Sequence, residues 1–178
     1  MIKSILAGIA IGIGALINLK VGGIAGAIFF SVGLFLVCIF RLNLYTGKVG
    51  YTGVAENLPI LLGNAIGCMF LLLYPMDNAK TIIANKLSTP FYITFINAII
   101  CGILIYAAVE AFKQGREYMI LICVPAFILC GAEHCVADIC YAASARIISV
   151  DLVYFILTVV IGNSIGSYVF RAITEEEA

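Results

Sequence analysis

The chain has 178 residues, of which 63% are hydrophobic and 11% are charged. A water-soluble domain of this length could not cover so much apolar surface, so the composition indicates a membrane protein. Ten basic and ten acidic side chains give a formal net charge of zero, which argues against the basic surface that nucleic-acid binding requires.

Long apolar segments alternate with short polar ones, and each is close to the length that a bilayer requires. They predict six spans, at residues 4–19, 23–40, 58–74, 91–109, 118–145 and 151–170. The N-terminal segment has no convincing cleavage site and is expected to remain as the first span. Residues 76–90 form the longest polar connection, where we expect a short surface helix. We therefore predict an all-α membrane protein with one transmembrane domain over residues 1–178.

The second and fifth predicted spans are interrupted. Residues 41–53 contain two basic side chains and three glycines, which make a continuous lipid-facing helix unfavourable. In the fifth span, Glu133, His134 and Asp138 follow a long uncharged stretch, and His134 is the single histidine of the chain. Ionisable groups at membrane depth are costly and usually line a polar pathway or cavity. The interrupted spans therefore predict a pore or a binding site.

An internal repeat supports this organisation. The third span contains LLGNAIGCMF and the sixth contains VIGNSIGSYVF, so that G-N-x-I-G occurs at residues 63–67 and 162–166. Each motif lies in the third span of a three-span half, and each half has a broken second span. Such halves, about residues 1–75 and 91–173, must insert in opposite orientations, as inverted repeats of transport proteins do. The alternative is that both motifs only pack helices closely.

Four interpretations compete for His134. It could be a buried structural histidine, or part of a metal site, although the spacing of the nearby candidate ligands matches no known pattern. Those ligands are Cys130, Cys135, Asp138 and Cys140. A catalytic role lacks a nucleophile and a hydrolase signature, so we expect neither an enzyme nor a bound metal or other cofactor. We favour a hydrogen-bonding and titrating group at the centre of a pore, because imidazole titrates near physiological pH.

The stretch Leu44-Tyr45-Thr46-Gly47 also has two interpretations. It is either an ordinary loop or a re-entrant segment whose Thr46 hydroxyl faces the pore while Leu44 and Tyr45 narrow it. Helix N-termini at such interruptions present unpaired N–H groups and attract anions.

Several segments together resemble the formate/nitrite transporter family, which includes hydrosulfide channels and lactate-type members. GAIFFSVGLFLVCIFRLNLYTGKVG at residues 26–50 looks like its second span and the following loop. FINAIICGIL at residues 95–104 is similar to its fourth span, and VPAFILCGAEHCVAD at residues 124–138 to its fifth. The two G-N-x-I-G motifs match its third and sixth spans.

This resemblance implies an aquaporin-like fold of two inverted three-helix halves. It also implies a homopentamer in the inner (plasma) membrane, with one pore per subunit and a cytoplasmic N-terminus. His134 falls on the central histidine of the family and Thr46 on the loop threonine that pairs with it. The resemblance assigns Leu34, Leu44 and Tyr45 to a cytoplasmic constriction, and Phe30, Val109 and Phe127 to an outer one.

The sequence departs from the family at three positions. Asp138 stands where the family usually has asparagine, and we expect it to lie one turn from His134 and to favour the protonated imidazole. The lysine that precedes the fourth span has no exact counterpart, since Lys86 lies four positions early. Arg41 stands where small residues are usual.

We therefore expect a channel or channel-like transporter in the lipid bilayer for a small monovalent weak-acid anion. Formate or nitrite is the first expectation and hydrosulfide the next, with proton-linked passage past His134, because an anion enters an apolar constriction only at high cost. One alternative is the membrane subunit of an energised vitamin importer that captures its substrate. Another is a channel for a neutral solute, which the absence of paired Asn-Pro-Ala motifs disfavours.

Overall fold

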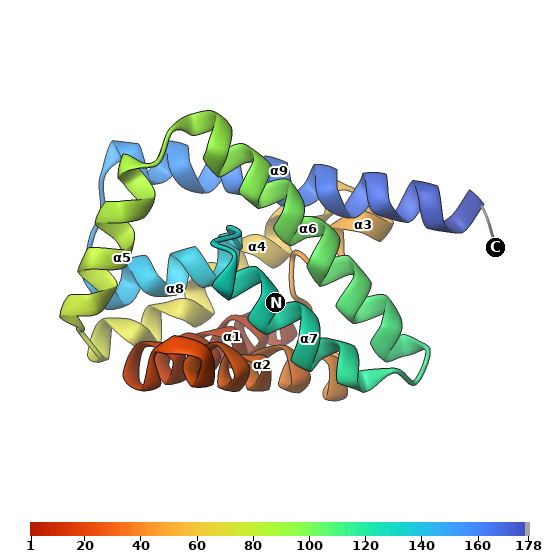
Figure 1. Ribbon diagram of the computed structural model, residues 1–178, viewed down its shortest axis with the longest axis horizontal. Helices are drawn as coiled ribbons and strands as arrows, with labels where there is room; N and C mark the ends of the chain where they lie inside the picture. Colours follow the sequence, from red (N-terminus) through yellow and green to blue (C-terminus); the bar gives the residue numbers. More distant parts are fainter. Residues whose placement is uncertain (177–178) are drawn as a thin grey trace.

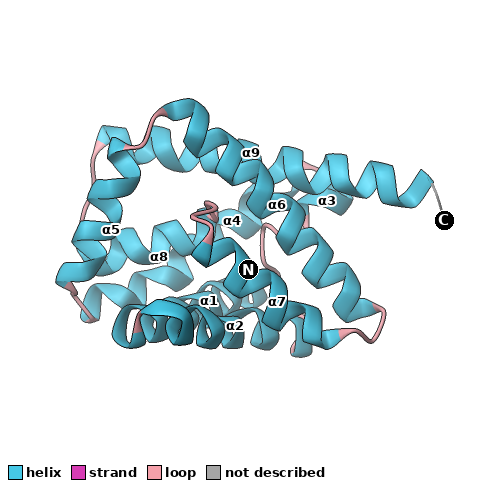
Figure 2. Cartoon of the chain, in the orientation of Figure 1, coloured by secondary structure: helices cyan, strands magenta, loops and turns pink. Residues whose placement is uncertain are grey.

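The computed structural model describes residues 1–176, and within that range the chain is helical without strands (Figures 1 and 2). This confirms the predicted all-α class. The helices are α1 (Ile2–Val21), α2 (Gly23–Ile39), α3 (Val49–Thr52), α4 (Val54–Cys68), α5 (Asp77–Ser88), α6 (Phe91–Lys113), α7 (Ile120–Leu129), α8 (Cys135–Ala145) and α9 (Val150–Glu176). Two short 3-10 helices, η1 (Met69–Leu73) and η2 (Glu117–Met119), extend α4 and precede α7.

Four segments of the described chain are long and apolar enough to cross a membrane. They are Ile2–Val21, Val54–Leu73, Phe91–Lys113 and Val150–Thr174, which match the first, third, fourth and sixth predicted spans. The other two are interrupted, as expected. A non-helical segment at residues 40–48, the first break, separates α2 from α3, and another at residues 130–134, the second break, separates α7 from α8.

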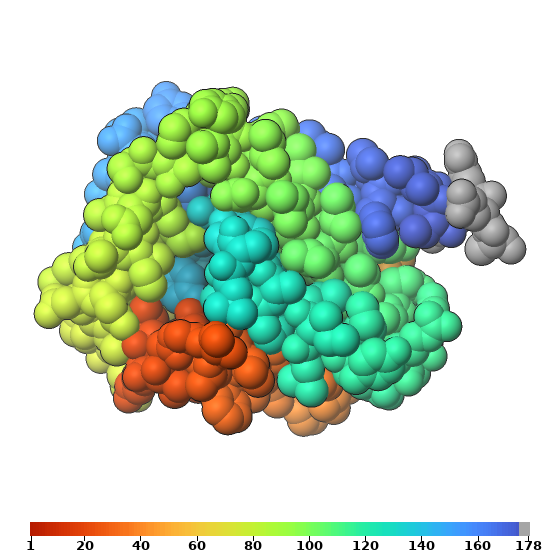
Figure 3. Space-filling model, viewed as in Figure 1, coloured from red at the N-terminus to blue at the C-terminus, as the bar shows by residue number. Residues whose placement is uncertain are grey.

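The predicted surface helix in the connection is present as α5, but it also has an inward face. Ala79 and Ile83 are fully buried, and the helix packs against α8. A hollow lies between α5 and the second break in the space-filling view (Figure 3). This position brings the end of α5 close to the polar residues of the second break.

Large apolar side chains remain exposed on the outer faces of the long helices. Phe29 on α2, Leu62 on α4, Ile96 on α6 and Ile161 on α9 each have more than half of their surface exposed. A soluble monomer rarely exposes apolar surface over so many elements. The surface is that of an integral membrane protein, which contacts lipid or neighbouring subunits.

The glycines of the repeated motif allow two helix pairs to approach backbone to backbone. A Cβ atom on Gly67 would lie 2.1 Å from the carbonyl oxygen of Ile5, where α4 crosses α1. A Cβ atom on Gly166 would lie 2.1 Å from the carbonyl oxygen of Ile99, where α9 crosses α6. Small residues permit this kind of contact between membrane helices.

We predict that Gly67→Ala lowers the stability of the protein by about 1–3 kcal/mol, because the methyl group meets a backbone atom that cannot move aside. Thermal unfolding in detergent measures the effect. Gly47→Ala is the matched control, since its nearest atoms would lie 3.6 Å away. Equal unfolding midpoints for the two variants would contradict the close contact of α1 with α4.

Candidate functional site

His134 ends the second break and caps α8. Its Nδ1 atom accepts a hydrogen bond of 3.0 Å from the backbone N–H of Ala137. The side chain is 2% exposed. Because Nδ1 is an acceptor, a neutral imidazole must carry its hydrogen on Nε2. The same ring therefore begins a helix and presents an N–H group at the break.

Thr46, in the first break, accepts the hydrogen bond from this N–H group. Its Oγ1 atom lies 2.8 Å from Nε2 of His134, and both residues are buried. Since Nε2 donates, the threonine oxygen accepts, and the hydrogen of the hydroxyl remains available to a further acceptor. The pair that the family resemblance implied is thus in direct contact, and no described residue accepts the hydrogen of the Thr46 hydroxyl.

Two phenylalanines lie on one side of this pair. The ring of Phe127 stacks on the His134 ring at 5.8 Å between centroids, with an interplanar angle of 25°. Phe30 meets Phe127 edge to face, also at 5.8 Å. These contacts join two of the three residues assigned to the outer constriction with the central histidine.

Of the other residues assigned to the constrictions, two line a cavity and Leu34 does not. Leu44 and Val109 line the same cavity beside the first break, and a Cβ on Gly47 would contact Val109 at 3.6 Å. Val109 is therefore beside Leu44, whereas the resemblance grouped it with the phenylalanines. Leu34 is buried.

Tyr45 is anchored away from that cavity. Its hydroxyl bonds Ser164 of α9 at 2.9 Å and its backbone N–H bonds the side chain of Asn64 at 2.9 Å. Its ring is fully buried. In this structure Tyr45 connects the first break to α9, an arrangement that its place in the sequence does not reveal.

Two asparagines hold the two breaks in equivalent ways. The Asn64 side chain donates to the carbonyls of Ser4 and Asn43 and accepts from the N–H of Tyr45, at 2.7 to 2.9 Å. The Asn163 side chain donates to the carbonyls of Ala98 and Glu133 and accepts from the N–H of Cys135, at 2.7 to 3.0 Å. Each is the asparagine of one G-N-x-I-G motif. The sequence contained this signal, since each is the one polar residue with a large side chain in its motif.

Lys86 at the end of α5 forms ion pairs with two acidic residues, Glu133 in the second break and Asp138 in α8. Its ammonium group binds the carboxylate of Glu133 and lies 3.0 Å from Oδ1 of Asp138. The Lys86 side chain is 17% exposed and that of Asp138 only 1%. Lys86 thus reaches the site although it lies four positions early in the sequence, because the end of α5 lies over α8 and a lysine side chain is long.

Asp138 differs from the expectation. Its carboxylate is on α8, one turn after His134, but it pairs with Lys86, while the His134 nitrogens are bound to Ala137 and Thr46. The second oxygen, Oδ2, is buried and has no hydrogen-bond partner among the described residues. Within residues 1–176, no group of three or more histidine, cysteine or acidic side chains is placed to hold a metal ion.

Together, the fold and the paired polar breaks define a helical membrane transport protein. The sequence model of the formate/nitrite transporter family matches residues 1–175, and the chain belongs to that family.

Solved structures agree with this fold. An ion channel of the same family has 24% sequence identity and a TM-score of 0.85, and the match covers 99% of this chain and 88% of that one. A pentameric formate channel with formate bound has 22% identity and a TM-score of 0.78, with coverage of 98% and 94%. No curated protein matches the chain by sequence at a significant level.

We predict that Lys86→Met destabilises the protein by about 3–5 kcal/mol, because it leaves two buried carboxylates without a counter-charge. Lys80→Met in the same helix is the control, since its pair with Asp77 has side chains 57% and 96% exposed and such pairs contribute at most about 1 kcal/mol. Thermal unfolding measures both variants, and Lys86→Met/Asp138→Asn should recover part of the loss. Equal effects of the two lysine variants would contradict the buried ion pairs.

Proposed function

We propose that the chain is a channel for a small monovalent weak-acid anion, with formate or nitrite first and hydrosulfide next. The observation that carries this proposal is the contact of His134 with Thr46, which leaves the Thr46 hydroxyl as a buried hydrogen-bond donor. A donor without an acceptor is suited to a passing solute that accepts hydrogen bonds. Membership of the formate/nitrite transporter family supports the same class of substrate.

Passage is linked to protons in this proposal. Buried apolar side chains lie near the polar pair, including Phe127 and Leu44, and a bare anion is costly in such surroundings. The solute therefore crosses the apolar parts largely as the neutral acid and meets its hydrogen-bond donor at Thr46. A protonated His134 would lose the bond from Ala137 N–H, so the neutral ring is the form that this geometry favours.

The matching contacts of Asn64 and Asn163 support six spans in two inverted halves. Helices α1, α4, α6 and α9 provide four spans, and the interrupted pairs α2–α3 and α7–α8 provide the other two. The same contacts support a single channel domain. The homopentamer is supported by the assembly named for the similar formate channel.

The basic residues support a cytoplasmic N-terminus in the inner membrane. The first break lies beside the N-terminus, because Asn43 N–H bonds the carbonyl of Lys3, and Arg171 bonds the carbonyl of Gly50. The basic residues at this end are Lys3, Arg41, Lys48, Lys113, Arg116 and Arg171. The opposite end has the remaining four of the ten, among them the ion-paired Lys86. This asymmetry follows the positive-inside rule.

Flux in proteoliposomes tests the proposal. Thr46→Val preserves volume but removes the donor, so formate flux should fall roughly tenfold, the effect of losing a hydrogen bond of about 1.4 kcal/mol. Thr46→Ser keeps the hydroxyl and should retain most of the flux. His134→Asn should also lower proton-coupled flux without loss of assembly, because asparagine is a good helix cap.

A panel of formate, nitrite, hydrosulfide, urea and glycerol completes this experiment. Flux of urea or glycerol alone would favour a neutral-solute channel, and tight capture of one metabolite without flux would favour an importer subunit. Wild-type, proton-coupled formate flux in Thr46→Val would contradict the role given to the polar pair.

We further expect native mass spectrometry in detergent to give five times the subunit mass of 19.1 kDa. The exposed apolar faces of α2, α4, α6 and α9 provide the surface for subunit contacts. A stable monomer or trimer would contradict the pentamer.

A further inference from the structure

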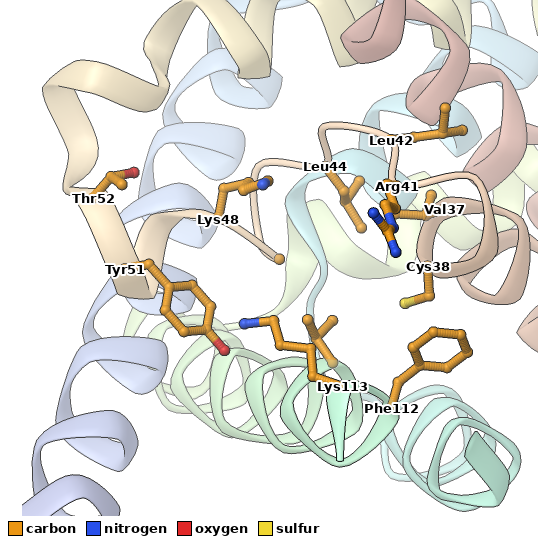
Figure 4. A pocket seen from close by; sticks show the side chains of 12 residues that line it. Val37, Cys38, Arg41, Leu42, Leu44, Lys48, Tyr51, Thr52, Phe112 and Lys113 are labelled. Carbon is orange, nitrogen blue, oxygen red and sulfur yellow. The ribbon is translucent and has the colours of Figure 1, made fainter. Parts of the chain in front are cut away.

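A cavity of about 600 Å³ lies beside the first break (Figure 4). It is bounded by the end of α2, the first break, α3 and the end of α6. Pockets that bind drug-sized ligands have volumes of about 300–1,000 Å³. The proposed permeant ions have only one to three heavy atoms, so this cavity is much larger than they require.

Three cationic side chains line the cavity: Arg41, Lys48 and Lys113. Figure 4 shows Arg41 and Lys113 reaching into it from opposite walls. Lys113 is partly compensated, since it lies 3.2 Å from Glu110 and over the ring of Tyr51 at 3.6 Å. Arg41 and Lys48 form no ion pair with the described residues. The cavity therefore has uncompensated positive charge.

The walls between these charges are apolar. Val37, Leu42, Leu44, Val109 and Phe112 all face the cavity. A site that combines cations with aliphatic and aromatic walls fits a molecule with an acidic group and an apolar body. An inorganic anion or a formate ion would leave most of these walls uncovered.

The backbone conformation of Arg41 is one that favours glycine over a residue with a side chain. Its φ angle is 50°, in the left-handed region that glycine adopts without strain and other residues adopt at a cost. The backbone alone would thus favour glycine. An arginine that keeps this conformation and extends into a cavity points to a role for its guanidinium group, which binds carboxylates in a bidentate manner.

We propose that this cavity binds an organic carboxylate with an apolar body, larger than the transported ion, and that Arg41 is its main polar contact. Leu44 lies in the wall of the cavity, two residues before Thr46, so a bound molecule of this size covers the approach to the polar pair from this side. Binding does not depend on the proposed function, whereas its consequence, inhibition of flux, does.

Cys38 provides a reporter inside the cavity, since it is partly exposed there. The background is Cys130→Ser, because Cys130 is the other accessible cysteine and the remaining five are buried. An anionic thiosulfonate reagent should modify Cys38 faster than a cationic one of similar size. 1-Naphthoate should protect Cys38, whereas the neutral 1-naphthalenemethanol and formate should protect it only at much higher concentration. Cys38→Ser gives the background of unspecific labelling.

Arg41→Gly separates binding from folding. Glycine accepts the left-handed backbone, so the unfolding midpoint should not fall, while the concentration of 1-naphthoate that protects Cys38 should rise roughly tenfold, as for a lost hydrogen bond to a charged group. Arg146→Gly is the matched control. Arg146 also has a positive φ, of 55°, but its side chain binds the carbonyl of Leu72, outside the cavity, so protection should be unchanged.

Formate flux into proteoliposomes is measured on the same preparations. 1-Naphthoate on the side of the cavity should inhibit the flux, and Arg41→Gly should weaken the inhibition. Protection of Cys38 in a protein without formate flux would leave the binding site supported and remove the proposed function. Normal flux without protection, protection that is equal in Arg41→Gly, or protection without inhibition would overturn the blocking site.

Discussion

The structure depends on how backbone hydrogen bonds are satisfied where the apolar helices α2 and α7 end. Peptide groups within a bilayer find no water, so each interruption needs internal hydrogen-bond partners. Asn64 and Asn163 supply them. Each side chain bonds a carbonyl of a break, an N–H in the break or directly after it, and a carbonyl of a neighbouring helix. With the breaks fixed in this way, Thr46 and His134 are held at the distance at which their side chains meet.

The glycines on either side of these asparagines are part of the same arrangement. Asn64 reaches the carbonyl of Ser4 only because α4 and α1 are in backbone contact, and that contact requires the absence of a side chain at Gly8 and Gly67. The motif thus combines close packing with a polar clamp. The close helix packing expected of G-N-x-I-G is present, and the asparagine of the motif adds hydrogen bonds to it.

Much of this was predictable from the chain alone. Charged residues within apolar stretches mark the two interruptions in the sequence, and Thr46 and His134 each lie in one of them. That the two side chains meet was implied only by the family resemblance. The partner of Asp138 was not predictable, since it depends on where α5 lies relative to α8, a tertiary contact across 52 positions. The family resemblance placed Tyr45 in the cytoplasmic constriction and Val109 in the outer one. In the structure the Tyr45 hydroxyl bonds Ser164, and Val109 of α6 lines the same cavity as Leu44. The direction of a side chain in the fold cannot be read from the sequence pattern.

The chain has one histidine, and its buried ring contacts Thr46, which lies 88 positions earlier in the sequence. Selective ¹⁵N labelling of histidine would therefore yield a spectrum with only two ring signals, both from the centre of the molecule. Their chemical shifts distinguish the tautomers and the charged ring, so the protein carries a native magnetic-resonance probe that needs no cysteine substitution, dye or unnatural amino acid.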